Sequence, residues 1–160
     1  MENTPIITSK ELLKHWQGHR QLTRRVIDAF PEKELFSYSI GGMRPFSAMA
    51  MELIRIAELG VTQMATRSID DTGLLYTKSE PATKAALLEL WDGVTGVIDR
   101  QWPQISDSRF RETEKAFGQY EGTVHSLIFY YFDNEIHHRG QGYVYLRSLG
   151  IEPPPFWDRP

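Results

Sequence analysis

The chain contains no cysteine, which excludes a disulfide framework, a thiolate metal site and a cysteine nucleophile. It also lacks an apolar run of the roughly 20 residues that a membrane-spanning helix needs. Its first residues, Met1–Pro5, have neither the basic nor the apolar region of a signal peptide. Together these absences predict a cytoplasmic protein that does not enter a membrane.

Positive charge is not concentrated in any part of the chain. The net charge is −3, acids and bases are interspersed, and no basic tail is present, so a nucleic-acid partner has little support. The sequence also lacks a glycine-rich phosphate loop, a nucleophile-elbow pattern and an HExxH zinc motif. Sequence alone supports no arrangement of serine, histidine and acid for nucleophilic catalysis.

What the chain does contain is a helical repeat of apolar residues in four stretches. The 160 residues, of which 41% are hydrophobic, suit a single domain over 1–160 with an ordinary core. Thr8 and Glu11 have capping-box spacing, Ser79 is a candidate cap, and Asp70–Gly73 interrupts the repeat. The pattern predicts an all-α four-helix bundle with helices over Ser9–Phe30, Pro45–Thr66, Glu80–Trp102 and Glu121–Leu149.

Two features complicate this simple bundle. The polar segment Pro103–Gly122 is compatible with a loop or with a short hairpin. The four successive aromatic residues Phe129–Phe132 point in four directions about 100° apart, so the last helix is expected to be buried nearly all round. A second subunit would cover the outer side in a homodimer, or the long loop or the C-terminal tail would cover it.

Polar residues in the last helix form the main candidate site. Asn134 and His138 are four residues apart and therefore share a helix face, at the edge of the apolar side. Glu52 lies at the edge of the apolar stripe of the second long helix. His15 and His19 have the same four-residue spacing, which is compatible either with a chelating pair or with hydrogen bonds to polar groups in the bundle. From spacing alone, a histidine at a core edge is more often structural than a ligand.

Three segments carry a family resemblance: Glu135–Gln141 (EIHHRGQ), Tyr145–Pro154 (YLRSLGIEPP) and Gly42–Ser47 (GMRPFS). The chain resembles the DinB family of four-helix-bundle metal proteins. The resemblance implies an up-down-down-up bundle, often dimeric, with three histidines around nickel, zinc or a similar divalent ion. His138 matches one of those histidines, whereas Asn134 and Glu52 stand where the resemblance implies the other two.

This departure leaves two interpretations open. Histidine and glutamate are good ligands for divalent ions and a neutral amide is a poor one. A metal site formed by Glu52, Asn134 and His138 would therefore be a degenerate site for nickel, zinc or manganese, and the resemblance implies a thiol-dependent transferase or a hydrolase. The alternative is a metal-free, small-molecule-binding or stress-associated dimer in which Glu52 pairs with His138. No catalytic residue is assigned under either interpretation.

Overall fold

The computed structural model describes residues 6–68 and 79–159. Within them the chain forms four long helices, one short helix, two 3₁₀ turns and a hairpin. The predicted break at Asp70–Gly73 lies outside the described residues. The elements are α1 (Ser9–Ala29), α2 (Glu32–Ser37), α3 (Phe46–Thr66), α5 (Lys84–Gln101), the 3₁₀ turns Trp102–Gln104 and Arg109–Arg111, β1 (Thr113–Ala116), β2 (Tyr120–Thr123) and α6 (Val124–Ser148).

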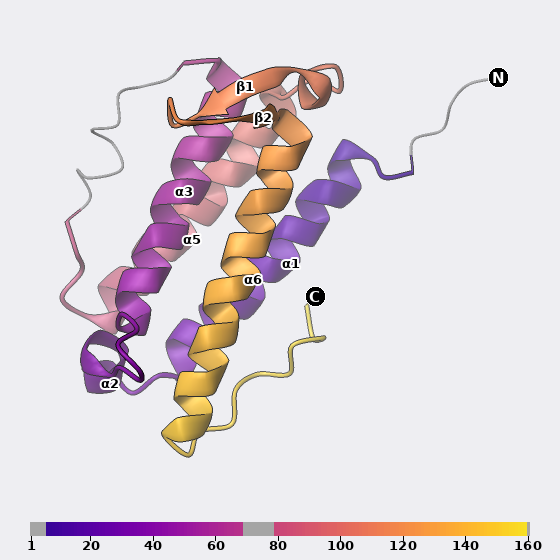
Figure 1. Cartoon of the computed structure of the whole chain (residues 1–160). Helices are drawn as coiled ribbons and strands as arrows, with labels where there is room; N and C mark the ends of the chain where they lie inside the picture. The colour runs from indigo at the N-terminus through magenta and orange to yellow at the C-terminus, as the bar shows by residue number, and fades with distance from the viewer. Residues whose placement is uncertain (1–5, 69–78, 160) are drawn as a thin grey trace.

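The four long helices form the predicted all-α bundle. Figure 1 shows α1 and α6 running in one direction and α3 and α5 in the other, which is the up-down-down-up order. Going round the bundle, α1 packs on α5, α5 on α3, α3 on α6, and α6 on α1. The consequence for the site is that α3 and α6, which carry Glu52 and His138, are neighbours along their length.

Local sequence signals explain how α1 begins. The hydroxyl of Thr8 accepts a hydrogen bond from the Glu11 backbone N–H at 3.2 Å, and a Glu11 carboxylate oxygen accepts from the Thr8 backbone N–H at 2.8 Å. This reciprocal pair satisfies two N–H groups that the first turn of a helix leaves without partners. The capping box expected from the spacing is therefore confirmed.

Two predicted helix starts are wrong. The third long helix begins at Lys84 and not at Glu80, because the side chain of Thr83, and not of Ser79, accepts the capping hydrogen bond, from the Ala86 N–H at 3.2 Å. The last helix begins at Val124, because the preceding residues pair as a strand. The short helix α2 was not predicted, since the sequence there was interpreted only as the end of α1.

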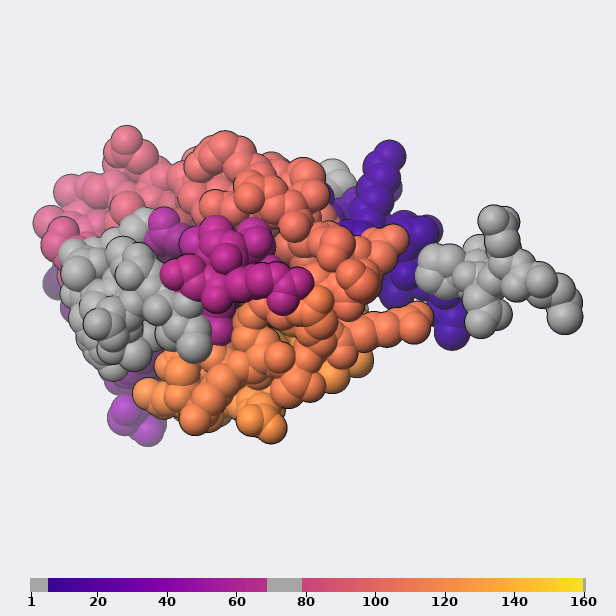
Figure 2. Space-filling model, turned by 90° about the horizontal axis from the view of Figure 1, so that it is seen from above, coloured from indigo at the N-terminus to yellow at the C-terminus, as the bar shows by residue number. Residues whose placement is uncertain are grey.

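The segment before α6 contains the hairpin that remained one of two options. β1 and β2 are antiparallel, with Ala116 opposite Tyr120 and Thr113 opposite Thr123. The hairpin lies across one end of the bundle (Figure 1), and Figure 2 looks onto that end. Gln63, near the end of α3, fastens the hairpin to the bundle: its side chain donates to the Lys115 carbonyl and accepts from the Phe117 N–H.

The aromatic run of α6 is divided between core and surface. Tyr131 and Phe132 are buried and pack near Trp16 of α1, at ring-centroid distances of 6.3 and 5.5 Å. Phe129 and Tyr130 remain exposed in the single chain. Neither the loop nor the tail therefore buries this helix all round. Within the described part of the chain, no helix is both long enough and apolar enough to cross a membrane.

Gly60 on α3 and Gly142 on α6 are each approached closely by an aromatic ring, whereas a Cβ atom added at Gly93 on α5 would meet nothing within 4 Å. A Cβ atom added at Gly142 would lie 2.6 Å from the Phe46 ring, whereas one added at Gly140 would meet nothing within 4 Å. The Phe46 ring is fully buried and stacks on Phe30, with ring centroids 4.9 Å apart, so it cannot move aside cheaply.

These two glycines therefore give a matched pair of variants. Gly142→Ala is expected to reduce the free energy of unfolding by about 1–3 kcal/mol, the usual cost of overpacking. Gly140→Ala is expected to increase it by about 0.5–1 kcal/mol, because alanine loses less backbone entropy in a helix. Urea unfolding followed by circular dichroism measures both. Equal effects at the two positions would contradict the described packing of α6 against Phe46.

Candidate functional site

The three predicted site residues lie together between α3 and α6. Nε2 of His138 is 3.1 Å from Oε1 of Glu52, and Nδ2 of Asn134 is 3.4 Å from the same oxygen. Glu52 comes from the second turn of α3, and Asn134 and His138 from successive turns of α6. His138 is 7% exposed, so the imidazole is nearly buried while the carboxylate reaches a more open position.

The hydrogen-bond partners of His138 define where its protons are. Nδ1 is 2.7 Å from Oε1 of Gln141, and the Gln141 amide nitrogen contacts Sδ of Met43 at 3.2 Å, which orients the amide. Nδ1 therefore donates its N–H to Gln141. The contact between Nε2 and the Glu52 carboxylate requires a second N–H, so both ring nitrogens are protonated in this arrangement. These two hydrogen bonds, the one to Glu52 first, raise the pKa of His138 despite the burial of its ring.

Arg44 is a fourth member of the cluster, and it was missed from the sequence. Its Nη2 lies 2.6 Å from Oε2 of Glu52, the oxygen that His138 does not contact. The hydrogen bond from His138 is the largest cause that lowers the pKa of Glu52; burial opposes it, and the hydrogen bond from Arg44 adds to it, so that the pKa falls to about 2. Glu52 is therefore a carboxylate at neutral pH. The only available signal was the position of Arg44 in the turn that leads into α3.

The cluster fits a divalent ion in part. Glu52 and His138 are two good ligands within contact of each other, and Gln141 already accepts the Nδ1–H, the outer partner that a metal-binding histidine commonly has. Asn134 offers its oxygen only if the amide turns over, because Nδ2 now faces the carboxylate. No group of three His, Cys, Asp or Glu side chains that could hold an ion occurs in residues 6–68 and 79–159. The Arg44 guanidinium also competes for the carboxylate.

The second histidine pair is brought together in a different way. Nε2 of His15 and Nε2 of His19 are 3.1 Å apart, but Nδ1 of His19 faces Nη2 of Arg139 at 2.9 Å. Arginine only donates, and Nη1 of Arg159 faces Nε2 of His19 at 2.9 Å, so a guanidinium group lies against each ring nitrogen of His19. A metal ion at His19 would have to displace one of these guanidinium groups. The geometry at His19 therefore favours the structural interpretation, in which the pair satisfies polar groups in the bundle.

Arg139 and His19 belong to a buried polar network that closes the space between α1 and α6. Glu135 accepts a hydrogen bond from the Thr23 hydroxyl at 2.6 Å, and Thr23 also accepts from Nη1 of Arg139 at 3.1 Å. Arg20, with no exposed surface, lies 3.9 Å from Glu135. The network is polar but nearly closed to solvent, so its role is to hold two helices together.

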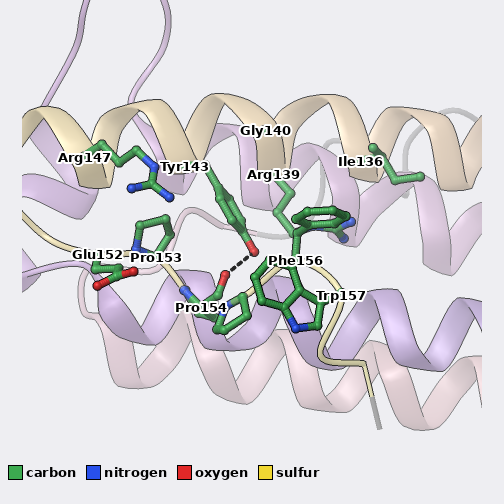
Figure 3. Close-up of a pocket in the computed structure, with 11 residues that line it drawn as sticks. Ile136, Arg139, Gly140, Tyr143, Arg147, Glu152, Pro153, Pro154, Phe156 and Trp157 are labelled. Carbon is green, nitrogen blue, oxygen red and sulfur yellow. Dashed lines mark hydrogen bonds between the residues drawn. The ribbon is translucent and has the colours of Figure 1, made fainter.

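The C-terminal tail covers the outer side of this network. Figure 3 shows the tail returning along α6, with the Tyr143 hydroxyl donating to the Pro154 carbonyl at 2.7 Å. A cavity of about 390 Å³ remains between the tail and α6. Beyond it, Arg25 pairs with Asp158 at 2.8 Å, and Arg159 reaches Nε2 of His19. This arrangement fixes the tail on α1 and away from Glu52.

The remaining histidine and acid candidates lie on the surface. His137 and Asp133 are exposed on the outer side of α6, as their helical positions predicted. His125 is exposed and places Nδ1 3.0 Å from the Phe110 carbonyl. None of them joins Glu52, so the polar cluster between α3 and α6 is the stronger site.

Together these features define a class of protein: an up-down-down-up helical bundle with one polar, ligand-like cluster between its second and last long helices. The chain belongs to the DinB family, whose model matches residues 1–158. A DinB-like protein from Bacillus subtilis superposes with a TM-score of 0.72 at 18% identity, covering 91% of this chain and 96% of that chain. A DinB-like protein from Bacillus cereus gives a TM-score of 0.72 at 15% identity, with 91% and 95% covered. No curated protein matches the chain.

Proposed function

We propose that this DinB-family protein is a metal-dependent transferase or hydrolase with a weakened divalent-metal site. Glu52 and His138 would be the two strong ligands, and Asn134 the third after its amide turns over. One observation carries the proposal: Gln141 accepts the Nδ1–H of His138, which leaves Nε2 as the nitrogen that exchanges a proton for an ion. When bound, nickel, zinc or manganese would supply Lewis acidity to a thiol or water substrate.

The residues around the ion would have separate roles. Gln141 keeps the His138 ring in the orientation that points Nε2 at Glu52, at 3.1 Å. Arg44 holds the carboxylate by its other oxygen at 2.6 Å, so it orients Glu52 and also competes with an ion for its charge. The affinity of this site for the ion would therefore be lower than that of a three-histidine site. We propose that this activity is cytoplasmic.

The test is the metal content of protein purified without an affinity tag. Elemental mass spectrometry after reconstitution with nickel, zinc or manganese is expected to find about one ion per chain, the number that one site holds. His138→Ala should abolish the uptake and Arg44→Gln should strengthen it, because the competing cation is gone. His137→Ala is the matched control, since it removes the adjacent, exposed histidine and should change nothing.

A second candidate function follows because the polar groups of the cluster already have hydrogen-bond partners within it. The arginine, the carboxylate, the imidazole and the glutamine amide are already hydrogen-bonded to one another. The cluster could therefore form one wall of a metal-free small-molecule site. No uptake of any of the three ions by the wild-type protein would reject the metal proposal and favour this alternative.

We also propose that the protein is a homodimer through the outer face of α6. Phe129, Ile136 and Val144 are 46%, 42% and 55% exposed, and they lie on one helix face with Gly140 between them. Exposed apolar residues aligned on one face are typical of an interface.

The dimer has a direct test in light scattering coupled to size-exclusion chromatography. The wild-type protein is expected at twice the mass of one chain, and Ile136→Glu at the mass of one chain, because the interface would then bury an unpaired carboxylate. Tyr120→Ser, which alters an exposed aromatic residue outside this face, should remain dimeric. A wild-type monomer at about 100 μM, well above the Kd of an ordinary stable dimer, would contradict the proposal.

A further inference from the structure

An open cleft of about 420 Å³ lies beside the candidate metal site. It extends from Arg44, in the turn before α3, along α3 past Glu52 to Ile56, and its other sides come from the hairpin tip and from Tyr130 of α6. A volume of this size is within the range of small-molecule sites, about 300–1,000 Å³. Glu52 lines both the cleft and the polar cluster, so a molecule in the cleft would lie against the candidate ligands.

The hairpin tip places an aromatic ring in this cleft in a strained backbone conformation. Phe117 has a φ of 54°, in the left-handed region that bulky residues rarely adopt. Gln63 holds the turn: it accepts from the Phe117 N–H at 3.1 Å and donates to the Lys115 carbonyl at 3.0 Å. Gln63 is itself nearly buried at 5% exposure. Strain that the surrounding structure maintains in this way is common at ligand sites.

The other walls of the cleft present two open aromatic faces. Tyr120 and Tyr130 line it and are 61% and 53% exposed. Together with Phe117 and Ile56 they form a surface suited to a flat apolar body, because aromatic rings pack on one another by offset or edge-to-face contact.

The Glu52 end of the cleft carries more positive than negative charge, because Arg44 and the doubly protonated His138 both contact the one carboxylate of Glu52. Arg44 bonds Glu52 through Nη2, and its other guanidinium N–H groups have no partner in the parts of the chain that the structure describes. A guanidinium offers five donors in a planar fork that matches a carboxylate or sulfonate. Arg55 also lines the cleft, and it pairs with Glu80 at 2.9 Å. Charge at one end and aromatic rings at the other complement an amphipathic anion.

We propose that this cleft binds the substrate of the candidate metal site and that the substrate is a small amphipathic anion, with its acidic group on Arg44 and its flat apolar body between Phe117, Tyr120 and Tyr130. That the bound molecule is a substrate rests on the proposed metal-dependent activity. Binding itself needs no metal, because the described side chains form the cleft. Phe117 and the two tyrosines would select the apolar body, and Arg44 would select the charge.

The experiment is a fluorescence titration of metal-stripped protein with 8-anilinonaphthalene-1-sulfonate, an aromatic anion, and with N-phenyl-1-naphthylamine, its neutral counterpart. Tyr130→Ser and Phe117→Gly are expected to weaken binding of both probes at least about fivefold, the scale of one lost aromatic contact. Arg44→Gln should weaken only the sulfonate probe. Phe156→Ser, at an exposed aromatic residue of the C-terminal tail outside the cleft, should leave both affinities unchanged.

Several outcomes would overturn the proposal. Unchanged affinity in the cleft variants, or loss of binding in Phe156→Ser, would place the probe elsewhere. If Phe117→Gly does not fold, Tyr120→Ser at an exposed position answers the same question. Zinc uptake measured on the same samples separates the two proposals: sulfonate binding without zinc uptake rejects only the metal site, and zinc uptake without binding in the cleft rejects only the substrate class.

Discussion

Replacing Glu135 with alanine is expected to lower the free energy of unfolding by about 3–5 kcal/mol, the cost of removing one partner from a buried ion pair. Glu135 is 2% exposed, and it lies 3.9 Å from a guanidinium nitrogen of Arg20 on one side and 3.9 Å from one of Arg139 on the other. Without the carboxylate, the two buried guanidinium groups lose the acid that lies near both of them. Urea unfolding at pH 7 measures the loss.

Arg20 makes this loss severe because it has no route to water. Its guanidinium lies 3.4 Å from the centre of the Trp91 ring, Nη2 donates to the Trp91 carbonyl, and Nε donates to Thr95. Nη1 has no hydrogen-bond partner, and Glu135 is the nearest acid to it. Burial, opposed by Glu135, lowers the pKa of Arg20 to about 10, so the side chain is still charged at pH 7.

Two further variants separate charge from packing in this network. Glu135→Gln keeps an acceptor for the Thr23 hydroxyl but removes the charge, so it should destabilise the protein less than alanine does. Asp133→Ala, two residues earlier and exposed, should change stability by less than about 0.5 kcal/mol. A loss below about 1 kcal/mol for Glu135→Ala would mean that the buried arginines do not depend on this carboxylate.

Acid is expected to destabilise the protein through His19. Burial, and then the nearby charge of Arg139, lower the pKa of His19 to about 3 from its ordinary 6.5. Between these pH values the unfolded chain binds a proton at His19 and the folded protein does not. The free energy of unfolding should therefore fall by about 1.4 kcal/mol for each unit that the pH drops from about 6 to about 4.

His19→Gln is expected to flatten this part of the stability profile, because glutamine does not titrate and its oxygen can still accept from Arg139. His137→Gln, at an exposed histidine, should leave the slope of the profile as it is in the wild type. Chemical unfolding at half-unit pH steps measures all three proteins. A His19→Gln profile that keeps the full wild-type slope would show that acid acts through other groups.

The apolar repeat predicted the bundle well because each long helix has one face to bury. Leu12, Trp16 and Val26 of α1, for example, lie in the core where their spacing placed them. Helix ends were predicted less well, since more than one nearby hydroxyl residue is suited to cap one helix. Ser79 and Thr83 are both suitable caps by type, and in the structure Thr83 accepts the capping hydrogen bond.

The candidate site could be predicted in part. The four-residue spacing put Asn134 and His138 on one face, and the family resemblance connected them with Glu52, which is 3.1 Å from His138 in the fold. Arg44 could not be predicted from its position in the turn before α3 alone, because its contact with Glu52 depends on the path of that turn. Likewise, spacing brought His15 and His19 together but could not show that Arg139 occupies the acceptor nitrogen of His19.

The most direct test of the central claim is the protonation of His138 during a zinc titration, observed by nuclear magnetic resonance on protein with ¹⁵N-labelled histidine. The account predicts that Nε2 exchanges its proton for zinc while Nδ1 keeps the proton that it donates to Gln141. His137 should keep its resonances. Unchanged His138 resonances at saturating zinc, or zinc at Nδ1 in place of Nε2, would contradict a metal site formed with Glu52.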